Sequence, residues 1–272
     1  MKTKLLKITL AILFLLPVCA NAAGTWTTLD YPGAIWTVAR DTSGSNIIGE
    51  YADTQNNRGG FLYNGTSWTS LPIIPDGIDG SNVVGDNTLY NITTQSSITL
   101  NYPGALEMGA LGISGNNIVG WYMDGFYPFN YHGFVYNTTT ETWTTLDYPG
   151  ATHTEAYGIS GSNIIGYAQD SSYNEYYFLY NGTSWTTLPI AASGIDGSNV
   201  VGGNTLYNIT TQSSITLNYP GALEMNALGI SGNNIVGWYK DSSGTHGFLY
   251  TIPEPATLLL LGLGAFLLRK SH

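Results

Sequence analysis

Cysteine is almost absent from this chain of 272 residues, which contains a single one, Cys19. Cys19 lies in an apolar leader, so the rest of the chain has no thiol for a nucleophile, a disulfide or a cysteine-ligated metal site. A chain without disulfides must be stabilised by its own apolar core. The ~230 residues between the leader and the tail are enough to form one.

Positive charge is also scarce. Between residues 23 and 250 the only cations are Arg40, Arg58 and Lys240, against 17 acidic residues, which gives a net charge of −14. Phosphate binding needs clustered lysine and arginine, so this composition excludes nucleic acid as a partner. A surface of this kind keeps a protein soluble outside the cell, and it also attracts cations such as Ca²⁺.

The chain lacks helical periodicity and the common catalytic motifs. No window from 24 to 250 sustains an apolar repeat of 3.6 residues. No serine or cysteine nucleophile motif, phosphate-binding loop or dinucleotide fingerprint is present. Thr, Tyr, Trp, Ile and Val are abundant instead, with many Gly and Asn between them, which is typical of short strands and turns.

The first 22 residues have the three parts of a signal peptide. A basic start is followed by an apolar run over 8–18 and a small-x-small site, Ala20-Asn21-Ala22. We expect cleavage after Ala22. A membrane anchor is the alternative, but the apolar run is short of the ~20 residues that a spanning helix needs. A lipoprotein signal at Cys19 is a second alternative, which the large Val18 before it disfavours.

The remaining sequence is a tandem duplication. TWTTLDYPGA occurs at 25–34 and again at 142–151, an offset of 117 residues. At the same offset, 77–122 matches 194–239 at all but two positions, where Asp86 and Gly109 of the first block correspond to Gly203 and Asn226 of the second. Repeats of this length indicate a repeat architecture.

Each block divides into smaller units of four short strands. In one long unit we expect strands at 110–114, 118–122, 133–136 and 142–146, separated by Gly, Asn and Ser turns. The shorter unit that precedes it keeps all four pieces, at 77–78, 83–84, 89–90 and 98–100, and loses only loop length.

Four-stranded meanders repeated radially form a β-propeller. The ends of the repeat region favour a closed ring, because 25–29 is a fourth strand without a unit before it and 247–250 is a third strand without a fourth after it. Pairing these two strands completes six blades and removes an open sheet edge. We therefore predict an all-β, six-bladed β-propeller of four-stranded blades over 23–250, with the N-terminal strand closing the last blade. Other all-β arrangements of the same strands are the alternative.

The composition changes abruptly in the tail, 251–272. Pro253-Glu254-Pro255 ends the sheet, and 256–268 is an unbroken apolar run that ends in Arg269-Lys270. We expect a C-terminal hydrophobic helix. Thirteen helical residues reach only ~20 Å, which makes it a marginal membrane span with its basic end on the cytoplasmic side.

These parts, in this order, resemble a PEP-CTERM sorting signal, with Pro253, Glu254, Pro255, Arg269 and Lys270 as the matching residues. The resemblance implies export through the N-terminal signal, transient retention in the inner membrane, recognition by an exosortase, and release or transfer to the cell surface. It also implies a bacterium that makes exopolysaccharide. A simple C-terminal membrane anchor is the alternative.

The repeats are also similar to HAF extracellular repeats, through His-Gly-Phe at His132 and His246. The histidine is absent before Phe61 and Phe178. This resemblance implies an extracellular location and no particular activity.

Several residue types suit chemistry, but the sequence assigns none of them as catalytic, cofactor-binding or metal-ligating. Aspartates recur in one loop of the long units and are suited to Ca²⁺ or to turn formation: Asp53, Asp124, Asp170 and Asp241. The repeated His132 and His246 fall short of the three or four ligands of a metal site. A glycosidase needs two carboxylates across a cleft, and the candidates are Glu50, Glu107, Glu155 and Glu224. Asn-x-Thr triplets begin at turn asparagines: Asn64, Asn91, Asn137, Asn181 and Asn208.

We therefore expect a non-enzymatic surface or matrix protein that binds polysaccharide or another envelope component. Its loops and the repeated Tyr31, Tyr102, Tyr148 and Tyr219 are the candidate contacts. An extracellular glycan-active enzyme is the alternative, which near-identical repeats disfavour because catalysis needs unlike groups at one place. A structural spacer is the third. Trp26, Trp68, Trp143 and Trp185 are expected to fill space between blades.

Overall fold

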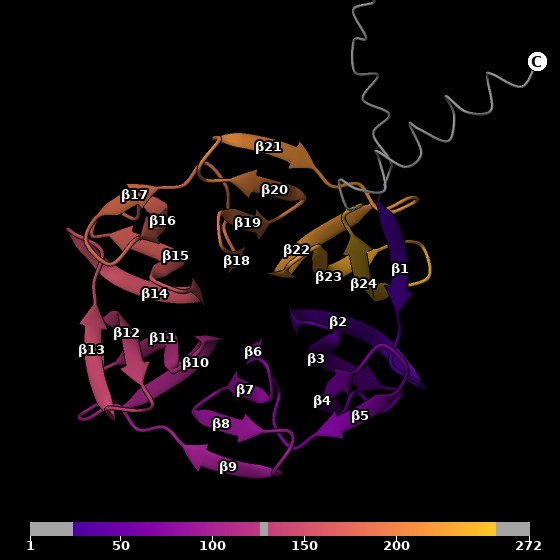
Figure 1. Ribbon diagram of the computed structural model, residues 1–272, viewed down its shortest axis with the longest axis horizontal. Helices are drawn as coiled ribbons and strands as arrows, with labels where there is room; N and C mark the ends of the chain where they lie inside the picture. The colour runs from indigo at the N-terminus through magenta and orange to yellow at the C-terminus, as the bar shows by residue number, and fades with distance from the viewer. Residues whose placement is uncertain (1–23, 126–129, 254–272) are drawn as a thin grey trace, which may run out of the picture. The chain divides into compact units, whose positions relative to one another are not determined.

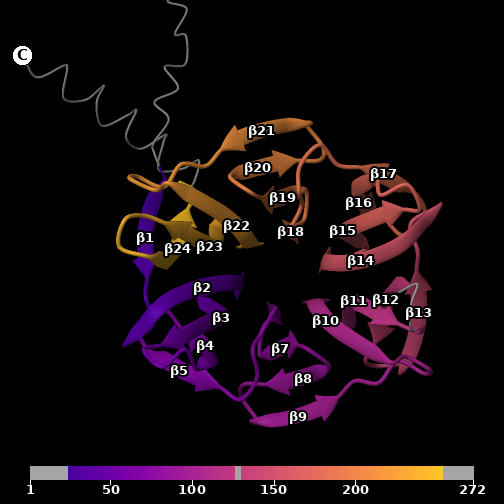
Figure 2. The same ribbon diagram turned by 180° about the vertical axis from the view of Figure 1, so that it is seen from behind.

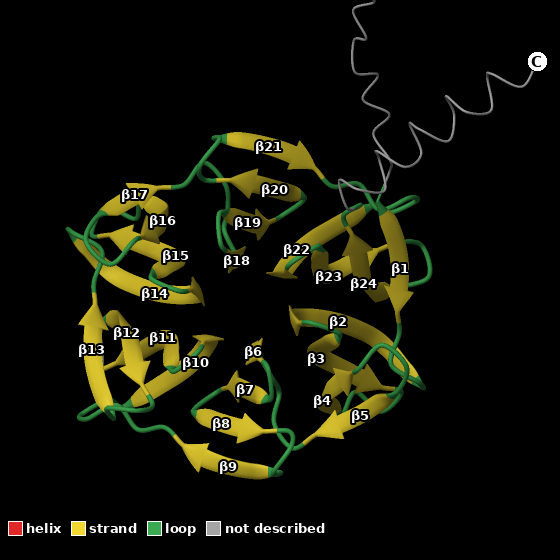
Figure 3. Cartoon of the chain, in the orientation of Figure 1, coloured by secondary structure: helices red, strands yellow, loops and turns green. Residues whose placement is uncertain are grey.

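The computed structural model describes residues 24–125 and 130–253, and Gly24–Ile252 form one compact unit. The described residues contain 24 strands and no helix (Figure 3). None of these described segments could therefore cross a membrane as a long apolar helix. The expected C-terminal helix at 256–268 and the signal peptide lie outside the described residues.

The strands form antiparallel meanders of four, which we number as units 1 to 6 and which surround a common axis (Figure 1). Four units are long. Unit 1 contains β2 (Ala34–Ser43), β3 (Asn46–Asp53), β4 (Arg58–Tyr63) and β5 (Trp68–Leu71), and unit 3 contains β10 (Glu107–Ser114), β11 (Asn117–Met123), β12 (Tyr131–Asn137) and β13 (Thr142–Leu146). Unit 4 contains β14 (Ala151–Ser160), β15 (Asn163–Asp170), β16 (Glu175–Tyr180) and β17 (Trp185–Thr187), and unit 6 contains β22 (Glu224–Ser231), β23 (Asn234–Lys240), β24 (Thr245–Thr251) and β1 (Thr25–Leu29).

The two short units are unit 2, β6 (Gly77–Asp79), β7 (Asn82–Gly85), β8 (Thr88–Asn91) and β9 (Ser96–Thr99); and unit 5, β18 (Gly194–Asp196), β19 (Asn199–Gly202), β20 (Thr205–Asn208) and β21 (Ser213–Thr216). The first strand of every unit lies nearest the axis and the fourth lies at the rim, in the front view and from behind (Figure 2).

The N-terminal strand closes the last unit as predicted. β1 pairs antiparallel with β24 along its whole length, from Thr25 opposite Thr251 to Leu29 opposite Gly247. The prediction of an all-β, propeller-like arrangement is confirmed by this topology. The strands expected within 110–146 are present, and the structure lengthens the first three of them by one to three residues at one or both ends.

The core is divided among the interfaces between neighbouring units. Each of the six clusters of buried apolar side chains joins two units, as when Val84 and Leu100 of unit 2 pack with Ile118 and Phe134 of unit 3. In the long units the tryptophan of the fourth strand packs edge-on against the buried phenylalanine of the third strand, with ring centroids about 5 Å apart. The pairs are Trp26–Phe248, Trp68–Phe61, Trp143–Phe134 and Trp185–Phe178. The expectation that these tryptophans fill space between blades is confirmed.

The inner strands of neighbouring units approach one another backbone to backbone. A Cβ atom on Gly112 would lie 2.9 Å from the carbonyl oxygen of Tyr157 and 3.0 Å from Cα of Gly158. Five of the six inner strands have glycine at this position, which gives a narrow throat: Gly77, Gly112, Gly158, Gly194 and Gly229. Asp41 takes the sixth position, and its carboxylate accepts a hydrogen bond from the Ile78 amide at 3.0 Å.

Candidate binding site at the centre of the ring

A β-bulge interrupts each of the four long inner strands at the same repeat position. The pairing with the second strand skips one residue, namely Arg40, Leu111, Tyr157 or Leu228. Bulges redirect side chains and recur beside functional sites. The corresponding residues of the short units, Asp76 and Ser193, directly precede β6 and β18.

These six residues, one from each unit, line a single cavity of about 310 Å³ together with Trp121 and Glu155. Its volume is at the lower end of the range for small-molecule sites, which combine apolar walls with a few placed polar groups. All six units therefore contribute to the surface of this cavity.

The lining does not follow the duplication. At the offset of 117 residues Arg40 corresponds to Tyr157, and Asp76 corresponds to Ser193, whereas leucine occupies both remaining positions. Near-identical repeats thus bring unlike groups together at this cavity. Each bulge residue lines the cavity, and in β2 and β14 that residue, Arg40 or Tyr157, differs between the two blocks.

Unit 1 supplies a charged cluster. The Glu50 side chain is buried and accepts hydrogen bonds from the guanidinium groups of Arg40 and Arg58. Burial by itself would raise the pKa of the Glu50 carboxyl, but the two guanidinium groups outweigh it and lower that pKa below its usual value. Glu50, a candidate catalytic carboxylate from the sequence, is thus held in an ion cluster.

Arg40 also faces Asp76, with 3.6 Å between its Nη1 atom and the Asp76 carboxylate. Burial raises the pKa of Asp76 to about 6, although the Arg40 charge opposes that shift. Among the described residues, the Arg40 Nε atom is buried without a hydrogen-bond partner. A buried donor without an acceptor costs free energy, so this atom favours an acceptor group in the cavity.

Unit 4 presents hydroxyl and aromatic groups at the equivalent places. His153, Tyr167 and Glu175 stand where unit 1 has Trp36, Glu50 and Arg58. The Nε2 atom of His153 lies 2.8 Å from the Glu155 carboxylate, and the Tyr167 hydroxyl donates to Glu175 at 3.0 Å. Burial raises the pKa of Tyr167 to about 12, so this hydroxyl is a neutral hydrogen-bonding group at ordinary pH.

Trp121 reaches the cavity because residue 109 is glycine. A Cβ atom on Gly109 would lie 2.8 Å from Nε1 of Trp121. The second block has Asn226 at this position, and its side-chain oxygen accepts a hydrogen bond from the Gly203 amide at 2.9 Å. In the second block, the two positions that differ from the first block, Gly203 and Asn226, therefore contact each other.

The four tyrosines expected to contact polysaccharide are packed within the fold. Each stacks on a second tyrosine, as Tyr102 does on Tyr122 with 3.7 Å between ring centroids. Their hydroxyls hydrogen-bond to the fourth strand, with partners Ser70, Thr145, Thr187 and Thr28 for Tyr31, Tyr102, Tyr148 and Tyr219. These side chains stabilise the connection between units. Their positions in the sequence alone did not predict this role.

The repeated aspartates and histidines also have structural partners. The carboxylates of Asp53, Asp170 and Asp241 accept amide hydrogens of their own turns. His132 lies 3.0 Å from Asp147 and 3.7 Å from Asp124, and His246 repeats this with Asp30 and Asp241. Among the described residues no three His, Cys, Asp or Glu side chains are grouped to hold a metal ion. The five turn asparagines each accept amide hydrogens two and three residues later, as Asn64 does from Thr66 and Ser67.

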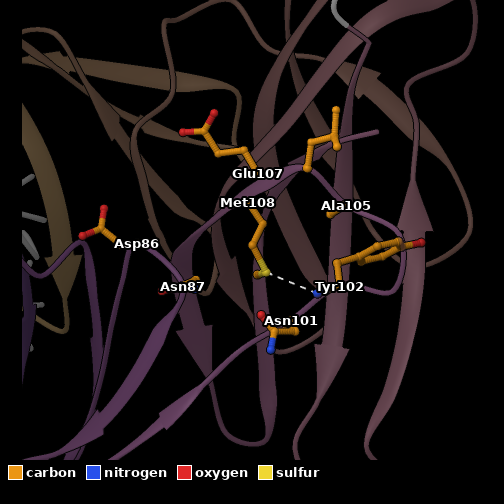
Figure 4. A pocket seen from close by; sticks show the side chains of 8 residues that line it. Asp86, Asn87, Asn101, Tyr102, Ala105, Glu107 and Met108 are labelled. Atoms are coloured by element: carbon orange, nitrogen blue, oxygen red, sulfur yellow. Dashed lines mark hydrogen bonds between the residues drawn. The ribbon is translucent and has the colours of Figure 1, made fainter. Parts of the chain in front are cut away.

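A second hollow, of about 370 Å³, lies between units 2 and 3 (Figure 4). Asp86, Glu107 and Tyr102 contribute to its lining, and the sulfur of Met108 accepts a hydrogen bond from the Tyr102 amide at 3.3 Å. Glu107 and its copy Glu224 are exposed first residues of β10 and β22. Of the four candidate glutamates, only Glu155 lines the axial cavity.

Sequence reasoning missed Arg40, Asp76, Trp121 and Tyr157 as site residues. Divergence between the two blocks was an available signal for Arg40, Asp76 and Tyr157, whereas Trp121 is the same residue as its counterpart Trp238 and carried no such signal. Of the predicted sorting residues, only Pro253 is described. Glu254, Pro255, Arg269 and Lys270, and the cleavage residues Ala20 and Ala22, lie outside the described residues.

Comparison with solved structures finds similarities at low identity, two of them to proteins described as propellers. The β-propeller domain of the Trilobed protease from Pyrococcus furiosus is 9% identical, with a TM-score of 0.45, covering 80% of this chain and 96% of that one. The AfRom2 CNH domain is 11% identical, with a TM-score of 0.43 and coverage of 83% and 98%. A lectin from Aleuria aurantia, described as a six-bladed propeller that recognises fucose, is 14% identical, with a TM-score of 0.34 and coverage of 85% and 77%.

No curated protein matches the sequence. One family model matches, the PEP-CTERM protein-sorting motif, over residues 251–270. The match supports the predicted exosortase-substrate signal at the same place. The chain therefore ends in a PEP-CTERM protein-sorting motif that follows an all-β, propeller-like unit.

Proposed function

We propose that this protein is an exported bacterial surface or extracellular-matrix protein that binds polysaccharide at the axial cavity without catalysis. The signal peptide directs export, the C-terminal helix holds the chain in the inner membrane, and an exosortase processes the tail. The fold is a six-bladed β-propeller closed by β1. The axial cavity is the observation that carries the binding proposal, since unlike residues from all six units converge there.

The chemistry of the cavity supports a carbohydrate ligand. Planar charged groups such as those of Arg40, Asp76 and Glu155 form paired hydrogen bonds to neighbouring hydroxyls. The aromatic face of Trp121 suits the C–H face of a sugar ring. The buried Nε atom of Arg40, which has no partner among the described residues, lacks the acceptor that a hydroxyl oxygen would provide.

Glycan-array binding by the full-length chain tests this proposal. The Gly109→Asn variant is the matched comparison, because the second block carries asparagine at this position without loss of its fold. We expect the array signal to fall in the variant while its unfolding midpoint stays close to that of the parent chain. Equal signals for both chains would place binding outside the axial cavity. The absence of a signal from both would favour a structural spacer without a ligand.

A glycan-active enzyme is the second candidate, favoured by one observation. Asp76, whose pKa burial raises to about 6, lines the same cavity as Glu155, and glycosidases use a pair of carboxyl groups beside the bond that they cleave. Reducing-end release from bound polysaccharide that disappears in both Asp76→Asn and Glu155→Gln would select the enzyme over the binding protein.

A further inference from the structure

We propose that five aromatic side chains beside the axial cavity bind successive sugar rings of an uncharged polysaccharide, whose end is held in the cavity. We call Trp121, Tyr131, His153, Tyr167 and Tyr177 the aromatic rim. This inference rests on the proposed function, because it extends the same binding site.

The rim is continuous from unit 3 across unit 4. Ring centroids are 5.3 Å apart for Trp121 and Tyr131, and 4.4 Å apart for Tyr131 and His153. From His153 to Tyr167 the centroid distance is 5.7 Å, and from Tyr167 to Tyr177 it is 5.6 Å. All five residues are half-buried. Tyr131 and His153 are stacked with 20° between their ring planes, whereas the other neighbouring rings are tilted or edge-on.

Two links join the rim to the cavity. Trp121 belongs to both, and the His153 ring lies within hydrogen-bond distance of Glu155, which also lines the cavity. A chain whose terminal sugar occupies the cavity therefore passes directly onto aromatic surface. Because the inner strands meet at the glycine throat, the cavity holds the end of a chain, and the rest of that chain must leave over the rim.

The opposite half of the ring has only part of such a surface. Trp238 and Trp36 stand where the rim has Trp121 and His153, but Thr245, Glu50 and Gly60 replace Tyr131, Tyr167 and Tyr177. The two halves therefore differ by three aromatic rings on one side and by the charged Glu50 cluster on the other. Each protein molecule therefore binds one polysaccharide chain, in one direction.

Charge determines the class of polysaccharide. The rim contains no lysine or arginine, and both arginines near the cavity are paired with acidic side chains, Arg40 with Glu50 and Asp76, and Arg58 with Glu50. The cavity itself adds Asp76 and Glu155. Acidic polysaccharides would be repelled by this site and by a ring domain of net charge −14, so the geometry points to neutral sugars.

Titration of the full-length chain in detergent micelles, followed by tryptophan fluorescence, tests the rim. The probes are neutral gluco-, galacto- and manno-oligosaccharides of one to six residues, with uronate oligosaccharides of equal length for comparison. We expect one neutral series to bind, with affinity that increases over the first three or four residues. We expect each rim ring to increase the binding affinity about threefold to tenfold, the range for an aromatic contact.

Two variants isolate the rim. Tyr131→Thr introduces the residue of the opposite half and should weaken hexasaccharide binding about tenfold while leaving monosaccharide binding unchanged. His153→Trp, also taken from the opposite half, keeps an aromatic ring and should retain chain binding, whereas His153→Ala should lose it. Unfolding midpoints check that each variant is folded.

The outcomes separate this inference from the proposed function. Affinity independent of chain length, unchanged in Tyr131→Thr but lost in Gly109→Asn, overturns the rim and leaves cavity binding intact. Preferential binding of uronates overturns the neutral class. Absence of binding to every probe overturns both the rim and the proposed cavity function.

Discussion

Arg40 and Tyr157 occupy the same position of the duplicated sequence, 117 residues apart, and line the same axial cavity. Each is the residue skipped by a β-bulge in its inner strand. The bulge therefore removes these two positions from the inter-unit core, where packing restricts side chains. A duplicated scaffold can thus acquire an asymmetric centre without changes to its interfaces.

The ion cluster of unit 1 should contribute to stability. Glu50→Gln removes the carboxylate that Arg40 and Arg58 share and should lower the free energy of unfolding by about 2 kcal/mol, less than for a fully buried pair because the arginines are partly exposed and Arg40 keeps Asp76. Urea unfolding measures the effect. Tyr167→Phe, at the equivalent position of unit 4, is the control and should cost less; an equal or smaller loss in Glu50→Gln would contradict the cluster.

Asp76 should make stability depend on pH in a defined direction. Its folded pKa of about 6 exceeds the unfolded value of 3.8, so protonation favours the folded state. Its stabilising contribution is complete below about pH 4 and is lost as the pH rises through 6, a change of at most about 3 kcal/mol. In Asp76→Asn this part of the pH dependence should vanish. Parallel thermal unfolding curves between pH 4 and 7 for both chains would argue against a raised pKa.

Closure by β1 should be a major source of stability. Deleting Thr25–Leu29 removes the buried Leu29 and the packed Trp26 and exposes the edge of β24, so the free energy of unfolding should fall by more than about 5 kcal/mol. Removal of the exposed turn residues Ser171 and Ser172, which leaves two residues to connect β15 and β16, is the control and should cost far less. Similar denaturation midpoints for the two deletions would refute closure of the ring by this strand.

The glycine throat should tolerate no side chain. Gly112→Ala places a methyl group 2.9 Å from a backbone oxygen of the next unit, and the strands must separate at a cost of about 1 to 3 kcal/mol. Gly125→Ala is the matched control, since no atom lies within 4 Å of its Cβ position. If both alanine variants unfold at the same denaturant concentration, the throat is wider than the structure indicates.

The sorting tail should determine where the protein is found. A chain that ends at Tyr250 lacks the matched motif at 251–270 and should leave the membrane fraction. Replacing Pro253, Glu254 and Pro255 with alanine should retain the full-length chain in the membrane, because the exosortase would no longer recognise it. Fractionation and blotting against the ring domain measure both. The sorting hypothesis would have to be abandoned if both chains fractionate like the parent.

The sequence by itself determined the repeat, the strands and the closure. Short apolar strands between Gly and Asn turns specify local meanders, as at 110–146, and the unmatched strand at 25–29 required a partner at the other end of the chain. The tail was also accessible to sequence reasoning, because its order of parts is local. Only the tertiary structure decided which residues meet at the axis. Arg40, Asp76 and Tyr157 are far apart in the chain, and the bulges that turn two of them inward leave no local pattern. Tyr31 and Tyr102, which composition suggested as ligand contacts, instead stack between units, since burial depends on neighbours that strand periodicity does not specify.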